Sequence, residues 1–168
     1  MSTLAKTLIT SLVDLLTEAY EGPPDPRSTW FIDNEPNSGI LGILEGVSAQ
    51  EASISVDGSG ERGSTIAANV EHLRWSLANA NSAFRGKEYN SKWSESWDLI
   101  TADEAAWERL RRALREEFEI LRQFLKEQTH LPEEYLTGVI ALVPHAAYHL
   151  GTIRQMIERV RLVRRRAG

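Results

Sequence analysis

The sequence contains no cysteine among its 168 residues. This absence excludes disulfides, thiolate metal ligands and a cysteine nucleophile. A chain without thiols also fits a reducing compartment, and we expect the protein to be cytoplasmic.

Several catalytic motifs are also missing. The chain has no GxxxxGK[ST] phosphate-binding loop and no GxSxG nucleophile elbow. It has no HExxH motif either, because Ala146 follows His145 where that motif requires glutamate. These absences exclude the commonest sequence signatures of nucleotide hydrolysis, serine esterases and zinc proteases.

Charge and hydrophobicity exclude two kinds of partner. The formal net charge is -5, so the chain as a whole does not attract nucleic acid or an anionic membrane. No apolar run is expected to approach the ~20 residues that span a bilayer. Arginines near the C-terminus are expected to stay solvated and to complement a helix dipole, and these are Arg159, Arg161, Arg164, Arg165 and Arg166. We therefore expect neither nucleic acid nor a membrane as a partner.

Apolar residues at spacings of three and four predict long helices, and no segment shows strand-like alternation. The predicted helices cover about residues 4–21, 64–85, 102–128 and 133–163, with Ser64 as the candidate N-cap of the second and Pro144 expected to kink the fourth. The pattern predicts an all-α fold, a four-helix bundle, in a single domain spanning residues 1–168.

A long connector, residues 22–63, separates the first two predicted helices. Loops of this length are uncommon in compact domains, so we expect it to be ordered. We expect short helical segments at 38–45 and 49–53, and packing of Trp30, Phe31 and the apolar run 40–44 against the helices. A second connector, residues 87–101, contains Trp93 and Trp97.

The histidines form the most informative pattern. His145 and His149 are four residues apart on a predicted helix, so their side chains lie about 40° apart around the axis and about 6 Å apart along it. His72 lies on another amphipathic helix and could supply a third imidazole. Three neutral nitrogens with one position open are typical of a catalytic metal site.

A second interpretation of these histidines stays open. A single buried histidine is commonly a hydrogen-bonded core residue, although burying two of them without partners would cost roughly 1–3 kcal/mol for each unsatisfied group. We interpret His130, beside Leu131-Pro132, as a surface residue.

Four tryptophans could line the mouth of the site or simply cover the ends of the helices. They are Trp30, Trp75, Trp93 and Trp97.

These residues together resemble the DinB-like superfamily, which includes the YfiT type of metal-dependent hydrolases. The resemblance rests on residues 69–77 around His72 and on residues 145–154 around His145 and His149. Weaker similarities at residues 38–41, 48–53 and 93–97 extend it over nearly the whole chain. The resemblance implies an up-down-down-up bundle of bacterial origin, commonly a homodimer, in which His72, His145 and His149 bind one divalent metal.

The resemblance implies two kinds of function. Some members are low-molecular-weight-thiol S-transferases or a thiol-dependent isomerase, so we expect a metal-dependent thiol transferase or hydrolase acting on a small-molecule thiol or electrophile. The alternative is a non-catalytic, stress-associated protein that binds a metal. Imidazole ligands do not distinguish zinc, nickel and iron, and Ala146 replaces an acidic residue that some relatives carry.

Overall fold

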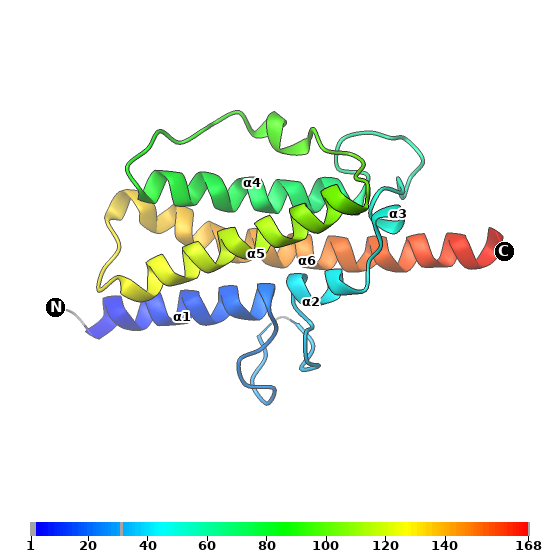
Figure 1. The fold of residues 1–168 in the computed structure, drawn as a ribbon. Helices are drawn as coiled ribbons and strands as arrows, with labels where there is room; N and C mark the ends of the chain where they lie inside the picture. Colours follow the sequence, from blue (N-terminus) through cyan, green and yellow to red (C-terminus); the bar gives the residue numbers. More distant parts are fainter. Residues whose placement is uncertain (1–2, 31, 168) are drawn as a thin grey trace.

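The computed structural model describes residues 3–30 and 32–167, and this part of the chain is all-helical (Figure 1). The predicted all-α class is confirmed. The elements in chain order are α1 (Thr3–Tyr20), α2 (Ile40–Glu45), α3 (Ala49–Ala52), α4 (Ile66–Phe84), the 3₁₀ helix η1 (Trp93–Trp97), α5 (Glu104–Glu127) and α6 (Glu133–Ala167).

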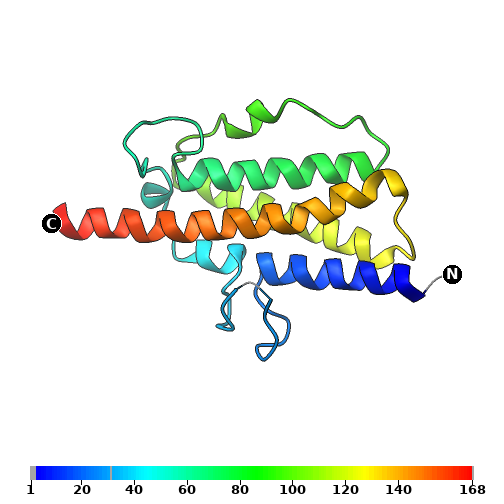
Figure 2. The ribbon, with the colours of Figure 1, turned by 180° about the vertical axis from the view of Figure 1, so that it is seen from behind.

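The long helices lie alongside one another. α1 and α6 run in one direction, and α4 and α5 run in the other (Figures 1 and 2). α4 packs against α5 and α6, and α1 packs against the same two helices, whereas no Cα atom of α1 lies within 8 Å of one in α4 in the described ranges. η1 lies over α4 on its solvent side (Figure 1). His72 on α4 and the histidines of α6 therefore come from adjacent helices.

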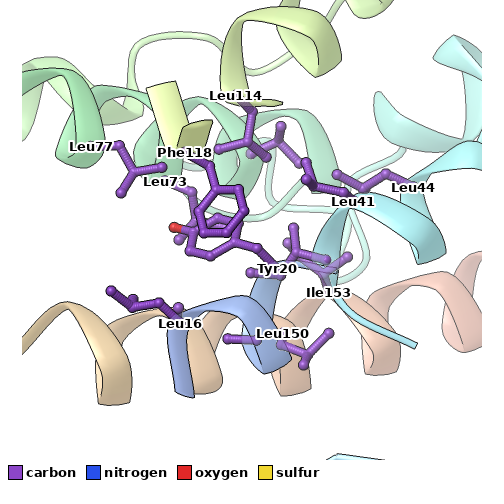
Figure 3. Close-up of a cluster of buried hydrophobic side chains, with 14 of the residues drawn as sticks. Leu16, Tyr20, Leu41, Leu44, Leu73, Leu77, Leu114, Phe118, Leu150 and Ile153 are labelled. Carbon is purple, nitrogen blue, oxygen red and sulfur yellow. The ribbon is translucent and has the colours of Figure 1, made fainter. Parts of the chain in front are cut away.

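The hydrophobic core lies between these helices (Figure 3). The rings of Tyr20 and Phe118 stack at its centre, with centroids 4.6 Å apart and planes inclined by 20°. The predicted apolar stripe of α5 is buried at every position, which explains why this helix packs on both α1 and α4. The stripe consists of Trp107, Leu110, Leu114, Phe118, Leu121 and Leu125. This core fixes the spacing of α4 and α6, on which the histidine geometry depends.

The long connector is ordered by short helices and by polar contacts. Ile40, Leu41 and Leu44 on α2 are buried, as expected. The buried carboxylate of Glu18 accepts a hydrogen bond from the Trp30 backbone N–H at 2.8 Å. The Trp30 side chain itself is 75 % exposed, so the prediction that it packs against the helices is wrong. The expected contact of Phe31 lies outside the described residues.

The connector closes tightly where α2 begins. A Cβ at Gly42 would lie 2.1 Å from the backbone oxygen of Asn37, and a Cβ at Gly39 would lie 2.5 Å from the backbone of Glu21. Only glycine allows these close backbone approaches. Arg154 of α6 secures the same segment by donating hydrogen bonds to the Asp33 carboxylate and the Ser38 carbonyl, both at 2.7 Å.

The N-cap of α4 is Thr65 and not Ser64, because the Thr65 hydroxyl accepts a hydrogen bond from the Ala68 N–H at 3.1 Å. Thr65 also donates to the Ile100 carbonyl at 2.7 Å, a long-range contact that local sequence does not reveal. Pro144 lies inside α6 as expected, and the first turns of this helix are inclined to the rest (Figure 2).

α6 corrects one expectation about membranes. Between Glu133 and Arg165 this helix is long enough and apolar enough to span a bilayer, judged by length and composition alone. The prediction that no segment approaches this composition is therefore wrong. The signal is weak by itself, because it depends on length and composition alone. α6 buries Leu150, Ile153 and His149 against the other helices, but only 28 % of its apolar window is buried.

Candidate metal centre

The structure brings together the three histidines that the sequence singled out. His72 projects from α4, and His145 and His149 project from α6, so that one ligand nitrogen from each lies within 4.8 Å of the others. The Nε2 atoms of His72 and His145 are 2.9 Å apart. The ring centroids of His145 and His149 are 4.8 Å apart, as expected for side chains one helical turn apart.

The hydrogen bonds of Asn69 define the tautomer of His149. The Asn69 side-chain NH₂ donates to the carbonyls of Gly63 and Thr65, both at 2.9 Å, which leaves only its Oδ1 facing the histidine. This oxygen lies 3.0 Å from His149 Nδ1 and can only accept. His149 Nδ1 therefore carries the proton, and its Nε2 presents a lone pair.

Ser96 defines the tautomer of His72 in the same way. The Ser96 hydroxyl donates to the Trp93 carbonyl at 2.6 Å, so its oxygen accepts from His72 Nδ1 at 2.6 Å. Ser96 is fully buried, which removes competing water from this bond. His72 Nε2 is therefore unprotonated and faces His145.

His145 is held less tightly. Its Nδ1 lies 3.5 Å from the Ser76 hydroxyl, at the limit of a hydrogen bond. Without a metal, His145 Nε2–H can donate to the lone pair of His72 Nε2. A metal would require this proton to leave Nε2, and Ser76 would then accept from the Nδ1–H of the other tautomer.

The four candidate tryptophans occupy different places. Trp97 stacks on His72, with ring centroids 3.9 Å apart and planes inclined by 13°. Trp93 lies 5.8 Å from His72 and 6.5 Å from His145, again between ring centroids. Trp75 packs against Trp93, with ring centroids 5.0 Å apart. Trp30 is exposed on the connector and lines neither of the cavities that reach the histidines.

Burial keeps all three imidazoles neutral. Desolvation, with a smaller contribution from His145, lowers the pKa of His72 to about 4. Desolvation and the two neighbouring histidines lower the pKa of His149 to about 3. Burial also lowers the pKa of His145. Neutral imidazole is the form that binds metals. At pH 7 none of the three rings is an imidazolium that must first release a proton.

The donor set fits one divalent ion. Histidines that bind metals almost always donate their second N–H to an oxygen, which fixes the ring. Ser96 and Asn69 provide such oxygens, and Ser76 lies where it can provide a third. In a tetrahedral zinc site the ligand nitrogens are about 3.3 Å apart, close to the separation of His72 and His145. In the part of the chain that the structure describes, this group includes no carboxylate.

Two cavities reach the histidines from different sides. His145 lines a cavity of about 510 Å³ between α4 and α6. His149, Trp97 and Asn69 line a second cavity of about 400 Å³, bordered by the loop that contains Asp57 and Arg62. A small molecule can therefore reach His145 from one side of the group and His149 from the other, whereas a closed structural site leaves no such access.

Sequence reasoning missed Asn69, Ser76 and Ser96. Asn69 and Ser76 stand three residues before and four residues after His72, so helical spacing places them on the same face of α4. That signal was available in the sequence. Ser96 had no comparable signal, because it reaches His72 through η1, which the sequence analysis treated as an irregular connector.

Acid is expected to destabilise the metal-free protein between about pH 6.5 and pH 4. The folded-state pKa of His72 lies below its unfolded value, so the unfolded chain binds more protons and the stabilisation is lost as the pH falls through this range. We expect a loss of at least about 1.4 kcal/mol, the equivalent of one pKa unit. Urea unfolding of chelator-treated protein at pH 7.5 and 4.5 measures it. His72→Gln should reduce the difference, and an unchanged difference in that variant would contradict the assignment.

Comparison of the chain with protein-family models, curated proteins and solved structures finds no match.

Proposed function

We propose that the chain is a divalent-metal-dependent enzyme in which His72, His145 and His149 hold one metal ion. The observation that carries the proposal is the state of the three rings. Each is neutral, two are fixed with Nε2 unprotonated, and cavities reach the group from two sides. We also propose that the long helices form a bundle of the DinB-like type, with α1 and α6 antiparallel to α4 and α5.

The reaction class that this site fits best is thiol S-transfer or hydrolysis. When bound, a divalent ion supplies positive charge that lowers the pKa of an adjacent water or thiol and polarises an electrophile. The chain has no cysteine, so the nucleophile must be an external thiol or water. The chain's own residues hold protons on His72 Nδ1 and His149 Nδ1, and the stacked ring of Trp97 shields one face of His72 from water.

A second candidate is a non-catalytic, stress-associated protein that binds a metal. One observation favours it: the polar side chains that contact the histidines are Asn69, Ser76 and Ser96, and none of these is a general base at pH 7. Some members of the family that the chain resembles carry an acidic residue at the position of Ala146. Ala146 is fully buried, and its side chain supplies no proton acceptor.

The setting of the protein is also a proposal. We propose a cytoplasmic homodimer that binds neither nucleic acid nor a membrane. Part of the C-terminal charge is paired within the chain, since Arg161 and Arg164 both contact Glu51. Large apolar side chains left exposed on α6 offer a surface that a second copy could cover: Ile140, Tyr148, Leu162 and Val163. Light scattering during size-exclusion chromatography measures the mass.

The function is tested with protein made without an affinity tag. Metal content is measured first, and the protein is then offered a small thiol and 1-chloro-2,4-dinitrobenzene. In this reaction the thiolate sulfur forms a bond to the ring carbon, and chloride leaves. We expect turnover that requires both the metal and His145. Equal rates with and without metal would contradict S-transfer. Full metal occupancy without transfer or ester hydrolysis would favour the non-catalytic candidate.

A further inference from the structure

The larger cavity has a defined course along α6. It begins near Glu134 in the first turn of this helix and ends at His145. Eleven residues separate these two positions, which corresponds to about 16 Å along a helix axis. The cavity volume of about 510 Å³ lies within the range of small-molecule sites. The lining therefore follows α6 from its first turn to His145, the one histidine of the group that this cavity touches.

The walls of the cavity are mainly apolar, and four of the twelve lining residues are phenylalanine, tyrosine or tryptophan. Phe84, Tyr89, Trp93 and Tyr135 contribute rings, and Ala80, Ala83 and Leu142 fill the spaces between them. Two of these side chains are unusually open to solvent: Tyr89 is 46 % exposed and Trp93 is 41 % exposed. Removing such apolar surface from water stabilises a complex by about 25 cal/mol per Å², so the walls favour an apolar ligand.

Contacts within the protein fix the lining side chains and the loop that contains Tyr89, so the cavity exists before a ligand binds. Phe84 stacks on Phe124 with centroids 4.6 Å apart and meets the edge of Tyr135 at 5.3 Å. Buried Asn79 fixes the loop that contains Tyr89, because it donates to the Asn90 carbonyl and accepts from the Asn90 N–H, both at 2.8 Å. A preformed cavity costs little conformational entropy when a ligand binds.

Polar groups lie mainly at the two ends. Ser76 and His145 lie at the inner end, and the exposed carboxylate of Glu134 lies at the outer end. The single charged residue of the lining is negative, so the cavity does not favour an anion. These ends favour a molecule that is neutral along its length and presents one polar or reactive group to the histidines.

We propose that this cavity binds the electrophilic substrate, and that the substrate is a neutral molecule with an aromatic or similarly flat apolar body. That the bound molecule is the electrophilic substrate rests on the proposed function. That the cavity binds an apolar molecule does not. The second cavity, next to His149, remains open to water or to a polar co-substrate when the first is filled.

Two glycines of α6 provide a matched test. Gly138 lines the cavity, Gly151 does not, and a Cβ at either position would meet no atom within 4 Å. Leucine at Gly138 should therefore fill the cavity without disturbing the fold, and leucine at Gly151 should make the same change outside it. Ala141→Met is a second filling variant, since Ala141 is exposed and lines the cavity.

The probe is N-phenyl-1-naphthylamine, a neutral aromatic dye whose fluorescence rises in apolar surroundings. We expect saturable binding to the wild type, at least tenfold weaker binding to Gly138→Leu and Ala141→Met, and unchanged binding to Gly151→Leu. Absence of binding to the wild type, or equal binding by all variants, would overturn the proposal. Zinc binding is measured on the same samples after dialysis against zinc: protein that binds no zinc and still shows this dye pattern would refute the proposed function and leave the cavity assignment intact.

Discussion

Replacement of His149 by alanine is expected to abolish stoichiometric binding of a divalent metal. His149 is 3 % exposed, and its Nδ1–H is committed to Asn69, so its Nε2 is the nitrogen left to bind the metal. Loss of an outer hydrogen-bond partner alone weakens metal sites about 10- to 100-fold, and loss of a ligand should exceed that. Elemental analysis after dialysis against a stoichiometric amount of zinc measures the occupancy.

His130→Ala is the matched control for this experiment. His130 is exposed between α5 and α6, as predicted, and it is not part of the histidine group. Its removal tests whether metal is bound merely by surface imidazole. Full occupancy in His149→Ala would contradict the site, and so would an equal loss of metal in the two variants.

Replacement of Phe118 by alanine is expected to reduce the free energy of unfolding by about 3–5 kcal/mol. Phe118 is fully buried, stacks on Tyr20 and lies beneath the guanidinium of Arg122, whose Cζ is 5.3 Å from the ring centroid. The substitution leaves a cavity beside the Tyr20 ring, where α1 meets α5 (Figure 3). It also removes the ring contacts with Tyr20 and Arg122. Urea denaturation followed by circular dichroism measures the change.

Ile120→Ala is the control for the core prediction. It lies on the same helix and is 42 % exposed, so its truncation should change the stability by no more than about 0.5 kcal/mol. Similar losses in both variants would mean that Phe118 is not at the centre of the core. A loss in Phe118→Ala below about 1 kcal/mol would mean the same.

The helices and their buried faces were predictable because their signals are local. The stripe from Trp107 to Leu125 repeats every three or four residues, and each of its predicted core positions is buried. The HxxxH spacing placed His145 and His149 on one face of α6 for the same reason. The separation of His72 from these two was not a local property, and it depends on how α4 packs against α6.

The hydrogen bonds around the histidines were not predictable in the same way. Ser96 contacts His72 only because η1 folds back over α4, a tertiary contact that no periodicity encodes. The prediction that Trp30 packs against the helices was wrong for a related reason. Its segment is held by a backbone hydrogen bond to Glu18, which leaves the ring in solvent despite its hydrophobicity. Local patterns identified the candidate ligands, and tertiary structure supplied the groups that orient them.

The most direct test of the account is the X-ray absorption spectrum of zinc-loaded protein prepared without a tag. The account predicts three imidazole nitrogens at about 2.0–2.1 Å from the metal, the usual zinc–histidine distance. It also predicts that the imidazole scattering falls by one ring in a variant that lacks His72 and retains metal at high zinc concentration. A spectrum of oxygen ligands with one imidazole or none would contradict the convergence of His72, His145 and His149 on one ion.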